Sequence, residues 1–259
     1  MCRLAAYLGP ELLLSRLLDG QPNNLERQAW DPKELNEARL NADGFGFGWY
    51  THEQRPVRYV NILPIWSDNN LAALGQSLHS AVWLANVRSA TPGQETSLTN
   101  TQPFIHDRLM FLHNGYLEGF NQGVRKRFHE FLEPDIQAGI RGNTDSEYLF
   151  ALLRQTLAEC DGQLMGCLKE GFELLERILV GKAALLNVVL YNGERIIACK
   201  HAMNGADCPS LYYCSAHPDF PQATLLTSER FSDHESWTAV PPHSILVIRP
   251  GRPVELTSL

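Results

Sequence analysis

The order of the helical and extended patterns is the sequence feature that most constrains the fold. Residues 148–160 and 163–180 each repeat apolar side chains at helical spacing, with Gly181 at the end of the second segment. Strand patterns follow at 183–191 and 194–201, and Asn192 with Gly193 between them suits the two positive φ angles of a tight hairpin turn. Two helices followed by a run of strands predict an α+β fold.

The first half of the chain mixes strands and helices joined by short connections. We expect strands at 3–8, 57–62, 81–87 and 109–115, helices at 10–20, 67–80 and 124–132 (the last one exposed), and a covering loop at 21–40. Further strands are expected at 211–215, 224–228 and 244–248. Because most neighbouring strands are joined by short turns, the prediction is two mainly antiparallel sheets covered by helices. Since no flexible linker interrupts residues 1–259, we expect a single domain.

Composition narrows the range of partners. The 259 residues are 44% hydrophobic and 20% charged, which is ordinary for a soluble globular chain. A net charge of -7 argues against a nucleic-acid partner, which would need a clustered basic face. Because no apolar stretch approaches the roughly 18–20 residues of a membrane span and no signal peptide is evident, we expect a cytoplasmic protein without a membrane partner.

The cysteines predict neither a metal site nor a cofactor. The six are Cys2, Cys160, Cys167, Cys199, Cys208 and Cys214, without a CxxC pair or a zinc-like spacing to histidine. Cys160 and Cys167 are seven positions apart, so we expect both on one apolar helix face. In a reducing cytoplasm all six are expected to be thiols.

The second residue could supply reactive groups. Removal of Met1 would make Cys2 the first residue, with a thiol beside a free α-amine. A thiol of pKa about 8.5 and an α-amine of pKa about 7.7–8.0 can exchange a proton near neutrality, which gives a nucleophile and a base in one residue. The alternative is that Cys2 is a small buried apolar side chain.

Alternating glycines mark residues 41–49. Gly44, Gly46 and Gly48 fall on one face of a strand, and a face without side chains lets another backbone or a ligand approach. A dinucleotide-binding loop is excluded, because such a loop opens a helix whereas this one continues into Trp49 and Tyr50. Tight strand packing and a ligand-facing wall both remain open.

Arg88 closes an apolar strand. A guanidinium next to a core needs an anion, which is either a carboxylate of the protein in an ion pair or a bound carboxylate. Both interpretations remain open at this stage.

A second polar group ends the strand at 109–115. The amide of Asn114 and the backbone N–H of Gly115 are two donors that could hold a developing oxyanion, although an ordinary turn uses the same residues. We interpret His113 as a packing or capping residue.

A third polar group precedes the helix at 148–160. Thr144 and Glu147 have the spacing of a capping box, so Asp145 lies in the first helical turn. There its carboxylate either serves the helix dipole or faces a ligand ammonium group.

These motifs together resemble a known family. Cys2, residues 88–91 (RSAT), 113–115 (HNG) and 144–147 (TDSE) follow the order seen in class II glutamine amidotransferases. Residues 1–3 (MCR), 27–30 (RQAW), 41–46 (NADGFG), 64–66 (PIW), 87–92 (VRSATP) and 228–229 (SE) are most similar to the ergothioneine-pathway γ-glutamyl hydrolases of the EgtC type. The resemblance implies the four-layer αββα sandwich of N-terminal-nucleophile hydrolases.

The resemblance also implies catalytic roles. Cys2 would attack the γ-carbonyl of a γ-glutamyl amide and its own α-amine would handle the protons, which requires that Met1 be removed. The Asn114 side chain and the Gly115 N–H would form the oxyanion hole. No metal or organic cofactor is implied.

Recognition of the substrate follows from the same resemblance. Arg88 would hold the α-carboxylate of the glutamyl group with help from Thr91, and Asp145 would pair with its α-ammonium. The substrate is then a small γ-glutamyl molecule such as γ-glutamyl-hercynylcysteine sulfoxide.

Two alternatives remain for the function. One is an amidotransferase subunit that acts on glutamine or a γ-glutamyl peptide with a partner chain, although the sequence does not imply a partner protein. The other is a catalytically silent γ-glutamyl-binding module. Trp30, Tyr50 and Trp66 either line the leaving-group side or pack in the core and at its rim.

Overall fold

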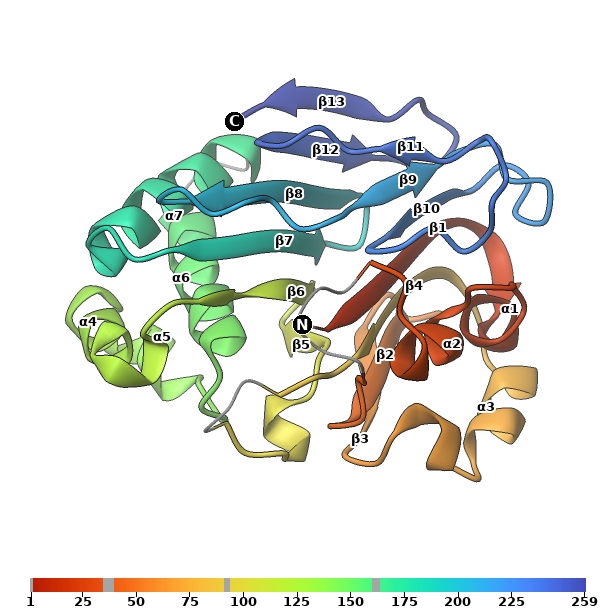
Figure 1. The fold of residues 1–259 in the computed structure, drawn as a ribbon, viewed down its shortest axis with the longest axis horizontal. Helices are drawn as coiled ribbons and strands as arrows, with labels where there is room; N and C mark the ends of the chain where they lie inside the picture. Colours follow the sequence, from red (N-terminus) through yellow and green to blue (C-terminus); the bar gives the residue numbers. More distant parts are fainter. Residues whose placement is uncertain (1, 35–39, 91–93, 160–163) are drawn as a thin grey trace.

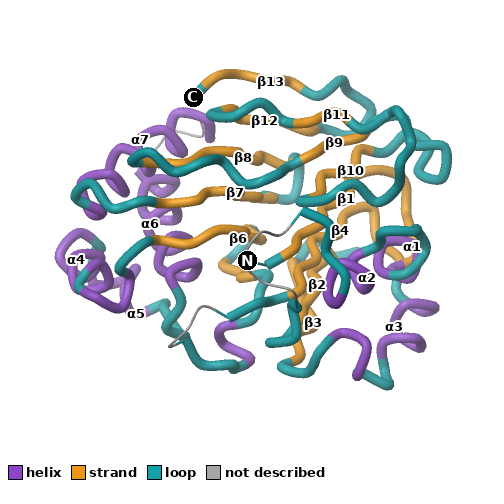
Figure 2. The backbone as a smooth tube through the Cα atoms, viewed as in Figure 1, coloured by secondary structure: helices purple, strands orange, loops and turns teal. Residues whose placement is uncertain are grey.

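Two antiparallel sheets lie face to face between two layers of helices (Figure 1). The computed structural model describes residues 2–34, 40–90, 94–159 and 164–259. Figure 2 shows the strands gathered in the middle and the helices on the outside. This arrangement confirms the predicted α+β class and its αββα layering.

The first sheet carries the N-terminal strand at its centre. Its strands, within the described residues, are β1 (Arg3–Leu13), β2 (Phe45–Tyr50), β3 (Pro56–Asn61), β4 (His79–Val87), β9 (Tyr212–Cys214), β10 (Thr224–Thr227) and β11 (Thr238–Ala239). They lie in the order β11-β9-β10-β1-β4-β2-β3. The central strand β1 pairs with β10 on one side and β4 on the other, both antiparallel.

The second sheet is formed by the middle and the end of the chain. Its described strands are β5 (Phe104–His106), β6 (Leu109–Leu117), β7 (Ala184–Tyr191), β8 (Ile196–Met203), β12 (Ser244–Ile248) and β13 (Glu255–Ser258). They lie in the order β13-β12-β8-β7-β6-β5. The expected strands at 211–215, 224–228 and 244–248 are confirmed within a residue or so at each end.

Helices cover the outer face of each sheet. The longer helices are α4 (Val124–Phe131), α6 (Asp145–Glu159) and α7 (Leu164–Leu179), and the shorter ones are α1 (Leu14–Leu18), α2 (Leu25–Trp30), α3 (Leu71–Ser77) and α5 (Pro134–Ala138). Single 3₁₀ turns occur at η1 (Ile65–Ser67), η2 (Leu98–Asn100) and η3 (Phe120–Gln122). Helices α6 and α7 lie over the second sheet, whereas α1, α2 and α3 lie over the first (Figure 1).

Three buried apolar clusters fill the spaces between the four layers. One joins α6 and α7 to the second sheet, and another joins α1 and α2 to the first. The third lies between the sheets, where Leu4 and Ala6 of β1 meet Met110 and Leu112 of β6. Alternate residues of β1 therefore face opposite cores, as the twofold side-chain period of a strand requires.

The helix expected at 10–20 is wrong in its first part. Strand β1 continues through Pro10 to Leu13, and only Leu14–Leu18 is helical. The pairing of β1 with β4 shifts register between Leu8 and Leu12, so Pro10 lies at an irregularity where its missing N–H breaks no regular ladder.

The loop expected at 21–40 contains the helix α2. The side chain of Asn24 accepts a hydrogen bond from the Arg27 N–H at 2.8 Å, which caps the helix, and Leu25 and Ala29 are buried. The four-residue spacing of these two apolar residues is a helical signal in a segment otherwise polar enough to suggest a loop. Residues 35–39 lie outside the described part of the chain.

Three further expectations need correction. The helix expected at 67–80 begins at Leu71, because Asp68 accepts hydrogen bonds from Tyr59, Asn61 and the Asn70 N–H and so holds a turn. The β7–β8 connection is four residues long rather than two, since Tyr191 pairs with Ile196. The helix α4 is only partly exposed, because one face is buried.

The glycines of β2 allow residues 102 and 103 to approach closely. A Cβ on Gly46 would lie 2.2 Å from the carbonyl oxygen of Gln102, and one on Gly48 would lie 2.8 Å from Pro103. The strand-packing alternative is therefore correct at these two positions.

Four of the described cysteines, Cys2, Cys199, Cys208 and Cys214, are free thiols. Cys167 is disulfide-bonded, so the expectation of six thiols is wrong, and Cys160 lies outside the described residues. Within the described ranges, no helix is both long and apolar enough to cross a lipid bilayer.

Candidate active site

Cys2 lies directly before β1 and against the neighbouring strand end. Its Sγ is 3.7 Å from the carbonyl oxygen of Ser89, which follows β4. The side chain is partly exposed, as a nucleophile must be to meet a substrate. Cys2 also contacts β6 of the second sheet.

The contact to the second sheet is made by Asn114. Its Nδ2 donates a short hydrogen bond to the carbonyl oxygen of Cys2. The Asn114 Oδ1 accepts a hydrogen bond from Asn187 Nδ2 at 3.3 Å, and the same Nδ2 donates to the carbonyl oxygen of Ser210 at 2.7 Å. This chain of amides turns the donor end of Asn114 toward the nucleophile.

Gly115 is required by close approach of the neighbouring strand. The motif at 113–115 lies inside β6 rather than in a turn at its end, because β6 continues to Leu117. A Cβ at position 115 would lie 1.8 Å from the carbonyl oxygen of Leu185 and 2.6 Å from His113 Nε2. No side chain fits there, and the backbone beside Asn114 therefore stays bare.

His113 connects this strand to the start of α6. Its ring is buried, with Nδ1 2.9 Å from Ser146 Oγ and Nε2 2.9 Å from the carbonyl oxygen of Leu185. Only a donor can satisfy a carbonyl oxygen, so Nε2 carries the proton and Nδ1 accepts from Ser146. Burial lowers the pKa of His113, against smaller opposing effects of Asp145 and Leu185. The interpretation as a packed histidine agrees with these contacts.

Arg88 is a buried cation without a carboxylate partner among the described residues. Its side chain is 3% exposed and donates to the carbonyl oxygens of Asp43 at 3.4 Å and Glu95 at 3.2 Å. Burial lowers the pKa of Arg88, and the charges of Cys2, Asp43 and Asp145 act in the opposite direction. Because the direct partners of the guanidinium among the described residues are neutral carbonyl oxygens, the geometry favours a bound anion over a structural ion pair.

Asp145 begins α6 and faces several donors. Its Oδ2 accepts from the Leu117 N–H at 2.9 Å, and its Oδ1 accepts from Ser146 N–H at 2.9 Å and from Gln94 Nε2 at 3.2 Å. The capping-box pattern is only half realised, because Thr144 Oγ1 caps the Glu147 N–H while the Glu147 carboxylate binds the N–H groups of residues 141 and 142.

Two cavities adjoin these residues. One, of 270 Å³, is lined by Gln94, Asp145 and residues 116–122. The other, of 670 Å³, is lined by Arg3, Glu34, Tyr116, Leu185 and residues 205–210. Tyr116, two residues after Asn114 on β6, lines both cavities.

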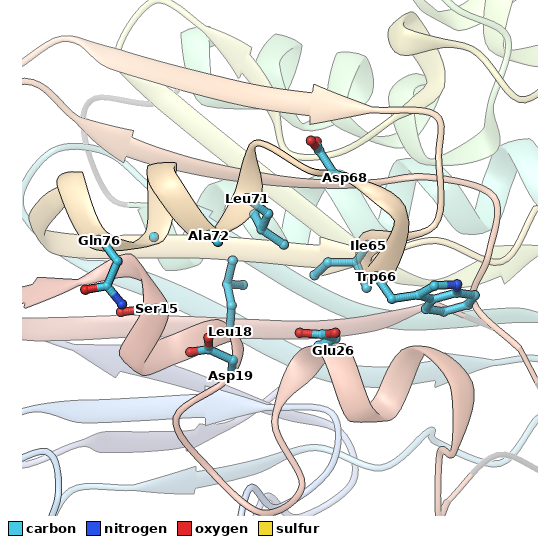
Figure 3. A pocket seen from close by; sticks show the side chains of 11 residues that line it. Ser15, Leu18, Asp19, Glu26, Ile65, Trp66, Asp68, Leu71, Ala72 and Gln76 are labelled. Carbon is cyan, nitrogen blue, oxygen red and sulfur yellow. The ribbon is translucent and has the colours of Figure 1, made fainter.

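A third cavity lies elsewhere. It has a volume of 240 Å³ and is bordered by Leu18 of α1, Glu26 of α2 and Leu71 of α3 in the outer helical layer (Figure 3). Trp66 is at its edge, whereas Tyr50 is buried against Tyr191 and Trp30 is exposed. None of these three aromatics is among the described residues that line the two cavities beside Cys2.

Five of the six predicted site residues are thus placed. Cys2 and Asn114 are in direct contact, Gly115 follows Asn114, and Arg88 and Asp145 are close enough for their charges to interact with each other. Thr91 lies outside the described residues.

Comparison with known proteins identifies the family of this chain. The model of the class II glutamine amidotransferases matches residues 28–227, which is more than half of the chain. The chain belongs to this family. The family predicted from the motifs is therefore confirmed, and the protein is an enzyme of the amidotransferase type.

Relatives of this amidotransferase are diverse in name. A probable glutamine amidotransferase, DUG3, from Saccharomyces cerevisiae is 26% identical and covers 96% of this chain and 82% of its own. A γ-glutamyl-hercynylcysteine sulfoxide hydrolase from Mycolicibacterium smegmatis is 26% identical and covers 96% of both chains. A sulfoxide hydrolase of the same name from Mycobacterium tuberculosis is 27% identical over all of this chain.

Solved structures share the fold. A class II domain protein from Silicibacter pomeroyi superposes with a TM-score of 0.73 at 23% identity over 99% of both chains. The glutamine phosphoribosylpyrophosphate amidotransferase of Bacillus subtilis superposes with a TM-score of 0.63 at 14% identity. The match covers 99% of this chain and 49% of that protein. The sandwich predicted for this amidotransferase is thereby confirmed.

Sequence reasoning missed residues that support the site. Asn187 interrupts the otherwise apolar, fully buried β7, and a buried amide in such a strand signals a required hydrogen bond. Arg3 and Glu229 form a buried ion pair next to Cys2. Arg3 follows Cys2 directly, whereas Glu229 lies 227 positions after it. Nothing in the sequence indicated that these two residues form a pair.

Proposed function

We propose that this amidotransferase hydrolyses γ-glutamyl amides through a thioester on Cys2. The observation that carries the proposal is the hydrogen bond from the Asn114 amide to the carbonyl oxygen of Cys2, on a strand whose Tyr116 lines two cavities. A nucleophile beside an amide donor and a bare glycine backbone suits acyl transfer.

The reaction would proceed in two steps. The Cys2 Sγ bonds to the γ-carbonyl carbon as its thiol proton passes to the free α-amine, and the resulting oxyanion is held by Asn114 Nδ2 and the Gly115 N–H. The C–N bond then breaks, the α-amine returns the proton to the leaving nitrogen, and a γ-glutamyl thioester remains. Water attacks this thioester, gives glutamate and restores the thiol.

The glutamyl group would occupy the cavity that contains Asp145. Its α-carboxylate is a suitable anion for the guanidinium of Arg88, which now binds only neutral carbonyl groups. Its α-ammonium would pair with Asp145 in place of Gln94, and Thr91 would assist the carboxylate contact.

The volume of the larger cavity indicates the size of the leaving group. Its 670 Å³ is in the range of cavities that bind whole organic ligands and far exceeds the need of ammonia. This size favours a bulky γ-glutamyl conjugate over glutamine. γ-Glutamyl-hercynylcysteine sulfoxide, named in two of the relatives, is the candidate we put first. An amidotransferase subunit working on glutamine with a partner chain is the second.

The test measures glutamate release by purified protein whose free Cys2 terminus has been verified by mass spectrometry. Glutamine, glutathione and γ-glutamyl-hercynylcysteine sulfoxide are compared at equal concentrations. We expect the highest kcat/KM for the sulfoxide and no activity in Cys2→Ser. Equal release by Cys2→Ser and wild type would refute the thioester mechanism, and preference for glutamine would overturn the substrate assignment.

Arg88→Lys tests recognition of the carboxylate. Because lysine cannot form the two parallel bonds of a guanidinium, we expect KM to rise about tenfold or more. The matched control is Arg127→Lys, since Arg127 also donates to two backbone carbonyl oxygens, at 2.8 and 2.9 Å, but lies on α4. A KM equal to that of the control would contradict the role of Arg88.

A further inference from the structure

Arg3 and Glu229 form an ion pair in which both side chains are 1% exposed. The Arg3 Nη1 lies 3.2 Å from Glu229 Oε1. Arg3 is the residue after the nucleophile, and Glu229 comes shortly after β10, the strand that pairs with β1. Burying two charges costs desolvation free energy that their mutual attraction does not always offset. We therefore ask what this ion pair does beside Cys2.

The guanidinium has a second partner. Its Nε donates a hydrogen bond of 2.8 Å to the carbonyl oxygen of Cys2. The same oxygen accepts the hydrogen bond from Asn114. The carbonyl oxygen of the nucleophile is therefore held from both sheets, by Arg3 on the first and by Asn114 on the second.

The carboxylate of Glu229 also gathers several donors. Its Oε2 accepts the Lys33 N–H at 2.9 Å, and its Oε1 accepts the Glu34 N–H at 3.1 Å in addition to Arg3. Glu34 in turn lines the larger cavity and accepts a hydrogen bond from Tyr212 at 2.8 Å. One buried carboxylate thus connects the nucleophile to the cavity wall.

A free N-terminal residue has an unusual need for such support. Once Met1 is removed, no preceding peptide plane fixes Cys2, and its backbone is held from one side only. The Cα that bears the carbonyl group also bears the α-amine and, through Cβ, the thiol. Holding the carbonyl oxygen therefore limits the directions that both reacting groups can take, and the contact of Sγ with the Ser89 carbonyl oxygen limits the thiol further.

We propose that Arg3 and Glu229 are positioning residues, which orient the Cys2 thiol and α-amine through the Cys2 carbonyl and fix the 33–34 wall of the leaving-group cavity. The proposal rests on the proposed function. Arg3 supplies the contact, and Glu229 aims and neutralises Arg3. Other charged groups among the described residues are Glu34 near Arg3, Arg88 with Asp43 and Asp145 beyond Cys2, and Asp207, which lines the same cavity as Arg3.

Two variants separate geometry from charge. Arg3→Lys keeps the positive charge, but a lysine ammonium lacks the planar, forked donors with which the guanidinium contacts Cys2 and Glu229 at the same time. Glu229→Gln keeps the shape and the acceptor oxygen but leaves the charge of Arg3 uncompensated. An uncompensated cation beside Cys2 favours loss of the protons of its thiol and α-amine.

Steady-state kinetics of both variants are measured with the γ-glutamyl substrate that the wild-type protein hydrolyses. The protein used is the form from which Met1 has been removed. For Arg3→Lys we expect kcat to fall about 10- to 100-fold, KM to stay within about twofold, and the acidic limb of the pH profile to stay in place. For Glu229→Gln we expect a similar fall in kcat and a shift of that limb to lower pH. Glu255→Gln, which breaks the surface pair of Arg249 and Glu255, is the control and should change neither.

A substrate-free readout keeps this proposal separate from the function. The alkylation rate of Cys2 by iodoacetamide, followed by peptide mass spectrometry against pH, should shift to lower pH in Glu229→Gln even if no γ-glutamyl substrate is turned over. An unshifted alkylation profile in folded Glu229→Gln overturns the proposal. A kcat of wild-type value in folded Arg3→Lys overturns it as well.

Discussion

The side-chain amide of Asn114 donates a hydrogen bond to the backbone carbonyl of Cys2, a residue 112 positions away in the chain. The contact crosses from β6 of the second sheet to the start of β1 in the first. It brings the proposed nucleophile and the proposed oxyanion donor together, and it is formed only when the two sheets are face to face.

Replacing Asn114 removes one of the two proposed oxyanion donors. We expect Asn114→Ala to lower kcat by roughly 100- to 1000-fold, which corresponds to about 3–4 kcal/mol of transition-state stabilisation. Asn187→Ala should have a smaller effect in the same direction, because Asn187 only turns the Asn114 amide. Steady-state kinetics with Asn69→Ala, an exposed asparagine, as control checks both. A kcat unchanged by Asn114→Ala would remove Asn114 from the mechanism.

A side chain at position 115 should be incompatible with the fold. Because a Cβ there would lie 1.8 Å from the Leu185 carbonyl oxygen, we expect Gly115→Ala to lower the free energy of unfolding by about 1–3 kcal/mol and to abolish activity. Gly166→Ala in α7 is the control, since a Cβ there meets nothing within 4 Å and alanine favours a helix by roughly 0.5–1 kcal/mol. Urea unfolding distinguishes them, and equal stability of the two variants would contradict the prediction.

Acidification should destabilise the protein through His113. Burial lowers the pKa of His113 in the folded state, whereas an unfolded histidine has a pKa of about 6.5. The unfolded chain therefore binds more protons as the pH falls below about 6.5, so the stabilisation present above that value is progressively lost. Burial also lowers the pKa values of His106 and His217, and that of His201 to about 4, which adds to the same trend.

The variant His113→Gln isolates this contribution. It should make the free energy of unfolding less dependent on pH between about 7 and 5, as measured by urea titration at several pH values. His79→Gln, which changes an exposed histidine at the start of β4, should leave the dependence as in the wild type. A slope for His113→Gln equal to that of wild type would show that His113 takes up its proton equally in both states.

Local patterns predicted the elements with strong periodicity. The long helices α6 and α7 and the strands β7 and β8 follow from apolar spacing that needs no distant partner. Two of the failures were segments where a distant partner decides. Strand β1 passes through Pro10 because β4 pairs with it again at Leu12 and Leu13, and the motif at 113–115 is extended because β7 pairs with it across Asn114 and Gly115.

The sequence by itself determined which chemical groups the protein has and their order, namely Cys2 at the start, Arg88 after one buried strand, Asn114 and Gly115 on another, and Asp145 at the beginning of a helix. It also determined the family. Only the tertiary structure decided that Asn187 aims the Asn114 amide, that Arg88 has no described carboxylate partner, and that Glu229 reaches Arg3. Side-chain spacing along one element fixes which face a residue occupies, whereas contacts between residues far apart in the chain depend on how strands pair and how the two sheets stack.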